Sequence, residues 1–302
     1  MNKIACVIVT YNRKDDLLIC LRAVLGQSEL PSSVYIVDNA STDGTGEMLA
    51  EMGYMGNGDT MPADPELHYL RMNENIGGAG GFYEGMKAAY NAGAEAIWVM
   101  DDDGVPEATC LEAMRPHLSN YDYIAPMVID VKDHSRLAFE YCGEKQEFMQ
   151  RAVDGLVQGV ACPFNGILYS HKLVETIGFP KKEMFIWGDE ENYNMRAIKA
   201  GFTPVTVISA IHRHPANRVM TAQSLLGPID IAPQMWRCYC RYRNAMYNHR
   251  EEMSLLGKAY VFINHVWYYL VMRRSWTWTK CYIHAFTDGL KGDFTKLNQY
   301  KQ

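Results

Sequence analysis

The sequence predicts an α/β protein built on a mixed, mainly parallel sheet, and three observations support this fold class. Short apolar runs rich in β-branched residues occur at 3–12, 32–39 and 94–103. Each run is followed by a segment whose apolar residues have helical spacing. Each run also ends in polar residues, as a buried parallel strand does. Alternation of this kind predicts a sheet with helices on both faces.

The expected helices follow from their residue patterns. Residues 13–28 place leucines at helical spacing behind two aspartates, which suit a helix start. Residues 40–52 offer Ser41 or Thr42 as a cap. A short strand then enters a Gly-rich turn, and 82–93 form a further helix that ends at its glycine. Shorter strands and one more helical segment follow in residues 118–215.

Charge divides the chain into two regions. From Arg237 onward there are 11 basic and 4 acidic residues, whereas the remainder has 18 basic and 31 acidic. The later region is also aromatic and helical in pattern. We therefore predict two domains, residues 1–220 and a C-terminal helical extension at 221–302.

Composition limits the class of protein. The chain has 302 residues, 48% hydrophobic and 21% charged, with a net charge of −6. This excludes a disordered polyelectrolyte and a nucleic-acid binder that relies on bulk charge. The eight cysteines lack framework spacing, and the opening apolar run is too short for a signal peptide. Reduced thiols in a cytoplasmic protein are expected.

Three aspartates directly follow the apolar run that ends at Met100. Asp101 and Asp103 point the same way on an extended backbone, and Asp102 points elsewhere. Two carboxylates in this arrangement can hold a hard divalent cation, which removes the repulsion between them. The alternative is a solvated acidic turn. An EF-hand loop is excluded, because Val105 stands where an oxygen ligand is required.

The stretch "NIGGAGG" at residues 75–81 could bring backbone close to a phosphate. Neither common nucleotide motif fits, because Tyr83 stands where G-x-G-x-x-G needs its last glycine and no G-K-[ST] follows. The alternative is a loop that needs positive φ or close backbone approach.

Acidic residues at 189–191 begin a segment of helical spacing. They could complement the helix dipole. They could also supply a general base, since a carboxylate near Trp187 in a cleft can take a proton from a hydroxyl. His212 and His214 end a later strand. A lone histidine is usually structural, but two near a candidate metal site favour a ligand role.

Five motifs, taken in their order along about residues 3–215, resemble those of inverting family 2 glycosyltransferases with the GT-A fold. The matching segments are "VIVTYNR", "VDNASTDGT", "NENIGGAGGF…WVMDDD", "FIWGDEENYNMRA" and "IHRH". Within the family, N-x-G-G-x-G-G-F together with M-D-D-D most resembles galactofuranosyltransferases, which use UDP-galactofuranose. Some rhamnosyltransferases, which use dTDP-rhamnose, share much of this pattern.

The resemblance implies a role for each matching residue. Asp103 and His212, with Asp101, would hold Mn²⁺ or Mg²⁺, and His214 is the alternative to His212. Family spacing puts the base at Glu190, with Asp189 second. The family's third acid is Asn192 here. The residues implied to bind the nucleotide sugar are Thr10, Tyr11, Asn12, Arg13, Asp38, Asn75, Gly77, Gly78, Gly80, Gly81, Asp101, Asp102 and Trp187.

The basic, aromatic extension has two interpretations. Its helices could complete the core or form a homo-oligomer interface. They could instead form an interfacial surface whose Arg273 and Arg274 meet anionic headgroups. The apolar run at 260–272 is too short to span a bilayer, which needs about 20 residues.

We therefore expect a cytoplasmic enzyme, with peripheral contact at the inner face of the cell membrane. It would transfer galactofuranose from UDP-galactofuranose to a hydroxyl of a glycan or lipid-linked saccharide in cell-surface polysaccharide synthesis. Alternatives are transfer of rhamnose from dTDP-rhamnose and a non-catalytic nucleotide-sugar-binding protein. A nucleotidyltransferase would show glycines after the first strand, which "TYNRKDD" lacks.

Overall fold

The computed structural model describes residues 3–54, 65–139, 144–216 and 220–301. The chain forms two compact units. The first contains Met1–Lys182 and Tyr193–Asn217, and the second contains Glu183–Asn192 and Arg218–Gln302. The sequence-based division at 220 and 221 had assigned Glu183–Asn192 to the first domain. In the structure these residues group with the C-terminal helices, to which several hydrogen bonds join them.

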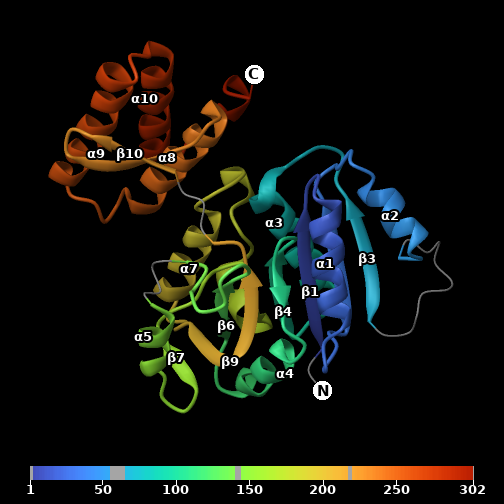
Figure 1. Ribbon diagram of the computed structural model, residues 1–302. Helices are drawn as coiled ribbons and strands as arrows, with labels where there is room; N and C mark the ends of the chain where they lie inside the picture. The colour runs from blue at the N-terminus through green and yellow to red at the C-terminus, as the bar shows by residue number, and fades with distance from the viewer. Residues whose placement is uncertain (1–2, 55–64, 140–143, 217–219, 302) are drawn as a thin grey trace. The chain divides into compact units, whose positions relative to one another are not determined.

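The first unit is built on a nine-stranded mixed sheet with strand order β3-β2-β1-β4-β8-β6-β9-β5, in which β7 also pairs with β9 (Figure 1). The half from β3 to β4 is parallel, and β8 runs antiparallel to both its neighbours. The strands are β1 Ile4–Thr10, β2 Ser33–Asp38, β3 Glu66–Arg71, β4 Ala96–Asp101, β5 Val105–Pro106, β6 Tyr123–Asp130, β7 Leu156–Gln158, β8 Asn165–Ser170 and β9 Val205–His214.

Helices cover both faces of this sheet, as the sequence predicts. Alternate strand residues point to opposite faces, so β1, β2, β4, β6 and β8 each contribute buried side chains to two apolar clusters. One cluster packs under α1, α2 and α4, and the other packs under α3, α6 and α7. The helices are α1 Lys14–Leu25, α2 Thr45–Glu51, α3 Gly77–Asn91, α4 Cys110–Met114, α5 Lys145–Gln150, α6 His171–Ile177 and α7 Asp189–Lys199, with short 3-10 helices η1 Arg115–Ser119 and η3 Lys182–Met184.

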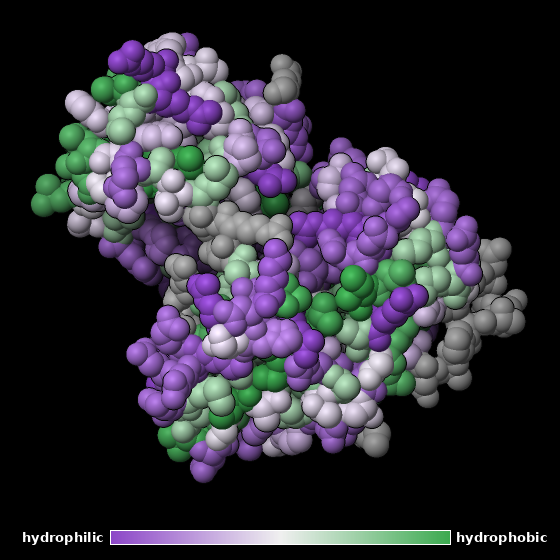
Figure 2. Space-filling view, in the orientation of Figure 1, coloured by the Kyte–Doolittle hydropathy of each residue, from purple (hydrophilic) through white to green (hydrophobic). Residues whose placement is uncertain are grey.

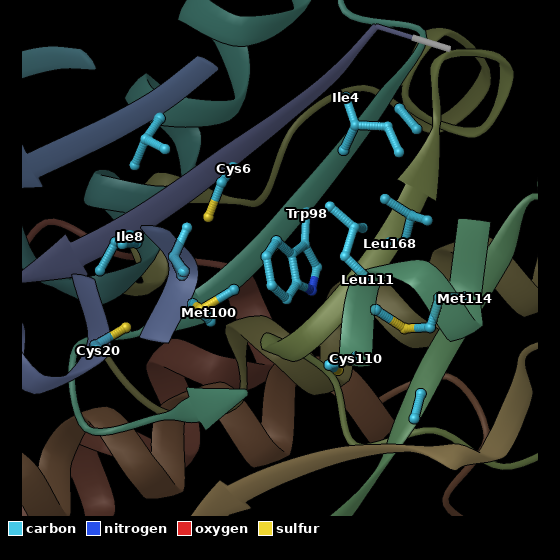
Figure 3. Close-up of a cluster of buried hydrophobic side chains, with 14 of the residues drawn as sticks. Ile4, Cys6, Ile8, Cys20, Trp98, Met100, Cys110, Leu111, Met114 and Leu168 are labelled. Carbon is cyan, nitrogen blue, oxygen red and sulfur yellow. The ribbon is translucent and has the colours of Figure 1, made fainter. Parts of the chain in front are cut away.

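Trp98 of β4 is the largest fully buried side chain of the first cluster. Figure 3 shows it between the sheet residues and the side chains of Cys110 and Leu111. Its indole nitrogen donates a hydrogen bond to the carbonyl oxygen of Gly166 at 2.8 Å, so the polar atom is satisfied inside an apolar core. This packing fixes β4, whose last residue is Asp101.

The Gly-rich stretch is helical and does not form the expected turn. α3 begins at Gly77, ahead of the predicted start at Phe82. A Cβ on Gly81 would lie 2.5 Å from Val9 Cγ1, and one on Gly85 would lie 2.5 Å from Val7 Cγ1. The glycines therefore let α3 lie closely against β1, and this packing outweighs their poor helix propensity.

The second unit contains the predicted C-terminal helices and an antiparallel hairpin. Its core is aromatic, with Tyr239, Tyr269 and Tyr282 almost fully buried. No helix among the described residues is both long and apolar enough to cross a membrane. The elements are the hairpin strands β10 Met220–Ser224 and β11 Gly227–Ile231, α8 Met235–His249, α9 Leu255–Trp267, the π-helix η4 Tyr268–Met272, α10 Trp276–Lys291 and η5 Leu297–Gln299.

Candidate active site

The candidate site lies at the carboxyl ends of β1, β2 and β4. These strands end at Thr10, Asp38 and Asp101, and β1 lies between the other two. In register, Thr10 pairs with Asp38, and Val9 pairs with Asp101. The strand order reverses between β1 and β4, which is where open α/β sheets bind their ligands. The fold therefore brings three polar strand ends together.

Asp102 is held inside the protein by contacts with the turn after β1. It is buried, and its carboxylate accepts a hydrogen bond from Thr10 Oγ1 at 2.7 Å. Arg13 Nη1 lies 3.2 Å from its other oxygen. Burial raises the pKa of Asp102 to about 6, against the lowering effects of Thr10 and Arg13. Asp102 thus ties the turn after β1 to the turn after β4.

Asp101, Asp103 and His214 form a three-residue group that could hold a metal ion. One donor atom from each lies within 4.8 Å of the other two. His214 Nε2 lies 3.1 Å from Asp103 Oδ1, and Arg13 Nη1 lies 2.8 Å from Asp103 Oδ2. His214 Nδ1 lies 2.7 Å from the carbonyl oxygen of Pro215. Because a carbonyl only accepts, Nδ1 carries the proton and Nε2 faces the carboxylates, as in metal-ligating histidines.

The pKa values in this group show strong electrostatic coupling. Burial and then the charge of Asp103 raise the pKa of Asp101 to about 8. Burial opposes ionisation of Asp103 too, but hydrogen bonding to His214 and the charges of His214 and Arg13 lower its pKa to about 2. Burial disfavours the His214 cation, yet Asp103 and Asp101 raise its pKa overall. A divalent cation fits this set, because it would offset the repulsion between the two carboxylates.

His212 does not join this group, although the family resemblance implies it as the ligand ahead of His214. It is fully buried between two glycines, and a Cβ on Gly104 would lie 2.4 Å from its Nε2. Burial, and then the charge of His214, lower the pKa of His212 to about 3. Both histidines lie on the same face of β9, but they are separated by two residues of rise, roughly 3.3 Å each. The structure brings the alternative, His214, to the carboxylates.

The turns after β1 and β2 are joined by their side chains. Asn12, in the left-handed region with φ +53°, accepts a hydrogen bond from Thr42 N at 2.7 Å. Asp38 is fully buried and accepts from Ser41 N at 2.8 Å and from Tyr69 Oη at 2.6 Å. Its carboxylate therefore already has two protein donors. Tyr11 and the Arg13 side chain remain substantially exposed beside it.

The start of α3 adds backbone to the same edge. Asn75 Oδ1 accepts from Gly77 N at 2.8 Å, and Asn39 Nδ2 donates to the Gly77 carbonyl at 3.2 Å. A Cβ on Gly80 would lie 2.8 Å from Ile76, so Gly80 has a packing role, as Gly81 does. By contrast, nothing lies within 4 Å of a Cβ built on Gly78.

The segment that leads into α7 belongs to the second unit and has a strained backbone. Phe185 and Trp187 have φ values of +69° and +60°, which are unusual for aromatic residues. The buried side chain of Asn244 in α8 donates to the carbonyl oxygens of Met184, Ile186 and Trp187 at 2.6–3.1 Å. No sequence pattern points to Asn244, which lies some sixty positions away in an aromatic helix.

The three acids at the start of α7 have different surroundings. Asp189 is buried, with 4% of its surface exposed. Glu191 accepts from Asn248 Nδ2 at 3.0 Å and lies 3.0 Å from His249 Nε2, so both its oxygens are engaged. Asn192, at the position of the family's third acid, donates to Asn248 Oδ1 at 3.1 Å. Glu190 is half-buried, and no described side chain pairs with its carboxylate.

The mixed sheet with a group of acidic residues at the carboxyl ends of its strands is compatible with a glycosyltransferase, and the sequence comparison shows the family. Residues 5–177 match the model of glycosyl transferase family 2, and the chain belongs to this family. It is 29% identical over 290 residues to "Galactofuranosyltransferase GlfT1" of Mycobacterium tuberculosis, covering 91% of this chain and 92% of that protein. The protein of the same name from Mycolicibacterium smegmatis is 29% identical over 288 residues, covering 90% and 91%.

Solved structures share the fold at low sequence identity. The mannosyltransferase PcManGT from Pyrobaculum calidifontis, in complex with GDP-Man and Mn²⁺, aligns with a TM-score of 0.55 and 14% identity, over 95% of this chain and 87% of that one. S. aureus TarS 1–349 aligns with a TM-score of 0.54 and 13% identity, over 99% and 91%. The expected fold class is thereby confirmed, and the protein is a glycosyltransferase that resembles proteins named galactofuranosyltransferases.

Proposed function

We propose that the protein transfers galactofuranose from UDP-galactofuranose to a hydroxyl group, with inversion at the anomeric carbon. The observation that carries this proposal is the Asp101, Asp103 and His214 group at the switch point of the sheet. The group occurs in a chain that aligns over 91% of its length with proteins named galactofuranosyltransferases. Supporting contacts come from the strand ends, where Thr10, Tyr11, Asn12, Arg13 and Asp38 form the side expected to face the nucleoside.

Asp101, Asp103 and His214 would hold Mn²⁺ or Mg²⁺. Two carboxylates and an imidazole whose Nδ1 is bonded to a backbone carbonyl suit such an ion. When bound, the ion acts as a Lewis acid on the diphosphate leaving group. Arg13 already contacts Asp102 and Asp103, so its cation lies where the charge of a diphosphate would also be stabilised. Gly78, which is partly exposed, and the start of α3 would approach the donor through backbone N–H groups.

Glu190 would act as the general base that takes the proton from the acceptor hydroxyl. Its carboxylate has no described partner, whereas both oxygens of Glu191 are engaged by Asn248 and His249. Asp189, the second choice, is buried. A base must be free to accept a proton, and Glu190 meets that condition best. Trp187 precedes it in the strained segment and would border the sugar site.

The acceptor would be a glycan or a lipid-linked saccharide used in cell-surface polysaccharide synthesis. The enzyme would act in the cytoplasm, with peripheral contact at the inner face of the cell membrane. It would be a homo-oligomer if the C-terminal helical extensions of two copies pack against each other. No nucleic-acid partner is expected, since the net charge is −6.

A donor panel tests the proposal. The purified protein would be given UDP-galactofuranose, UDP-galactopyranose, UDP-glucose and dTDP-rhamnose with and without Mn²⁺, and nucleotide release would be measured. Metal-dependent release is expected only with UDP-galactofuranose, and Asp103→Ala and His214→Ala should reduce it by at least 10²-fold, the order expected for lost transition-state electrostatics. Release with dTDP-rhamnose instead would assign the enzyme to rhamnose transfer and reject the proposal.

His117→Ala serves as the control variant, because His117 lies in η1, away from the carboxyl ends of the parallel strands. This variant should release nucleotide at the wild-type rate. Equal losses in His117→Ala and His214→Ala would show that the effect of His214 is not specific to the site.

A further inference from the structure

The helix formed by α9 and the π-helix after it is apolar on two sides. Its inner side carries Phe262, Val266 and Tyr269, which pack in the aromatic core of the second unit. Its outer side carries Leu256, Tyr260 and Ile263, followed by Trp267 and Leu270, at intervals of three and four residues. These outer side chains are 84%, 49%, 50%, 40% and 45% exposed. A surface helix normally carries polar residues on that side, so this face is built to be covered.

The hairpin between β10 and β11 extends the same face. The Asn264 side chain accepts from Leu226 N at 2.8 Å and donates to the Gly227 carbonyl at 3.2 Å. Ser224 Oγ donates to the Asn264 carbonyl at 2.7 Å, and the Tyr260 hydroxyl donates to the Leu226 carbonyl. These bonds hold the hairpin turn against α9, with Leu225 and Leu226 half exposed beside Tyr260.

We call the exposed side of α9, η4 and this turn the outer face. Figure 2 shows hydrophobic residues at the surface along the edge where Figure 1 labels α9.

The charges around the outer face are of one sign. Between Met253 and Thr287 the chain has four basic residues and no acidic ones. Arg273, Arg274 and Lys280 are exposed, and the Arg273 guanidinium stacks on the Trp278 ring at 3.6 Å. The acids that flank this stretch in the sequence are Glu251 and Glu252 before α9, and Asp288 of α10, which is buried and pairs with Lys296. Asp230 of β11 pairs with Arg241. The face is therefore apolar at its centre, aromatic at its sides and cationic at one end.

This combination of apolar, aromatic and cationic side chains favours one kind of partner for the outer face. The same face of a second copy offers no anionic partner for these cations, because the stretch from Met253 to Thr287 contains no acidic residue. A bilayer with anionic lipids offers an apolar layer for leucines, an interface for Tyr and Trp, and phosphates for Arg and Lys. The described helices cannot span that bilayer.

We propose that the outer face lies in the headgroup region of a membrane rich in anionic lipids, with Arg273, Arg274 and Lys280 on lipid phosphates. This inference develops the membrane contact included in the proposed function and is independent of the donor sugar.

Liposome flotation of the full-length protein tests the proposal. Vesicles of phosphatidylcholine alone would be compared with vesicles that also contain phosphatidylglycerol, at low and high salt. The wild-type protein should float with the anionic vesicles and less with neutral ones. Leu255→Ser/Leu256→Ser should lose flotation under both conditions, because these side chains are 83% and 84% exposed and contribute little to the core. Arg274→Gln/Lys280→Gln should weaken binding to anionic vesicles by roughly fivefold per charge, the equivalent of about 1 kcal/mol each.

Ile19→Ser/Ile198→Ser is the matched control, since both isoleucines are about half exposed in the other unit. This variant should float as the wild type does. The proposal is overturned if the wild-type protein stays in solution with every vesicle, or if Leu255→Ser/Leu256→Ser floats normally. It is also overturned if the only effect of Leu255→Ser/Leu256→Ser is to dissociate a dimer of the protein into monomers. UDP release from UDP-galactofuranose in the absence of vesicles should be unchanged in all these variants. Lost release with retained flotation would count against the proposed function and leave the surface assignment standing.

Discussion

The side-chain amide nitrogen of Asn244 lies 2.6 Å from the carbonyl oxygen of Trp187 and donates a hydrogen bond to it. The same nitrogen lies 3.0 Å and 3.1 Å from the carbonyl oxygens of Met184 and Ile186. Three carbonyls converge on one amide because Phe185 and Trp187 adopt positive φ. Such conformations persist only where neighbouring groups hold them. Asn244 therefore fixes the backbone that leads to Glu190.

Asn244→Ala should destabilise the second unit and lower activity together. Buried carbonyls that lose their donor cost about 1–3 kcal/mol, so we expect the free energy of unfolding to fall by about 2–4 kcal/mol. Asn244→Asp should be worse, because a carboxylate would face three carbonyl oxygens. Urea unfolding followed by circular dichroism measures the loss. Asn298→Ala, at an exposed position in η5, should change stability by less than about 0.5 kcal/mol. Unfolding of Asn244→Ala at the wild-type urea concentration would show that the strained backbone holds without Asn244.

Glu190→Gln and Glu191→Gln should separate catalysis from structure. Removing a general base typically costs about 10²- to 10⁴-fold in rate, so Glu190→Gln should lose transfer by that factor while it still binds UDP. Glu191→Gln should keep transfer within a few-fold, because it removes only the charge that faces His249. Transfer is measured by product formation and UDP binding by calorimetry. Normal turnover by Glu190→Gln would show that Glu190 is not the general base.

Some of this site was predictable because it depends on local periodicity. The apolar run that ends at Met100 indicated where β4 ends, and β4 does end at Asp101, with Asp102 and Asp103 in the turn that follows. The choice between His212 and His214 was not predictable, because both lie on one face of β9 and only long-range register decides which one reaches β4. In the structure Asp130 pairs with His214, and Val128 pairs with His212.

The grouping of Glu183–Asn192 with α8 also depends on contacts between distant residues, in this case with Asn244. The early start of α3 has the same origin. Glycine propensity alone predicts a turn, and only the close packing of Gly81 on Val9 shows why a helix forms there.

Two glycines of α3 should respond oppositely to alanine. A Cβ on Gly81 would meet Val9 Cγ1 at 2.5 Å, so Gly81→Ala should destabilise the first unit by about 1–3 kcal/mol through overpacking. Gly78→Ala has open space and should leave stability unchanged or raise it by up to about 1 kcal/mol through helix propensity. Thermal unfolding distinguishes the two.

Gly78→Ala also tests the proposed approach of backbone to the donor. If that approach is correct, this stable variant should bind UDP-sugar more weakly than the wild type. Unaltered affinity for the UDP-sugar would show that Gly78 does not contact the donor.

The acidic group should make the stability of the metal-free protein fall as pH rises. The pKa of Asp101 is raised from 3.8 to about 8, so between these values the folded state holds a proton that the unfolded state has released. Stability therefore decreases with pH across this window. The raised pKa of His214 acts in the same direction above 6.5. The lowered pKa of Asp103, about 2, has the opposite sign, and its contribution is lost only as pH falls from 3.8 toward 2.

Asp101→Asn should weaken this dependence and expose the cost of the site. An amide cannot ionise, so without metal the variant should be more stable than the wild type near pH 8 and similar near pH 5, as expected when a buried like-charge pair is relieved. Adding Mn²⁺ should stabilise the wild type, with an apparent affinity that rises about tenfold per pH unit below about 8, because binding displaces the Asp101 proton. The variant should gain little from Mn²⁺. Thermal unfolding with EDTA or Mn²⁺ at several pH values measures both effects. If Mn²⁺ stabilises Asp101→Asn as strongly as the wild type, Asp101 is not a ligand, and its carboxylate would have to serve another purpose at this edge of the sheet.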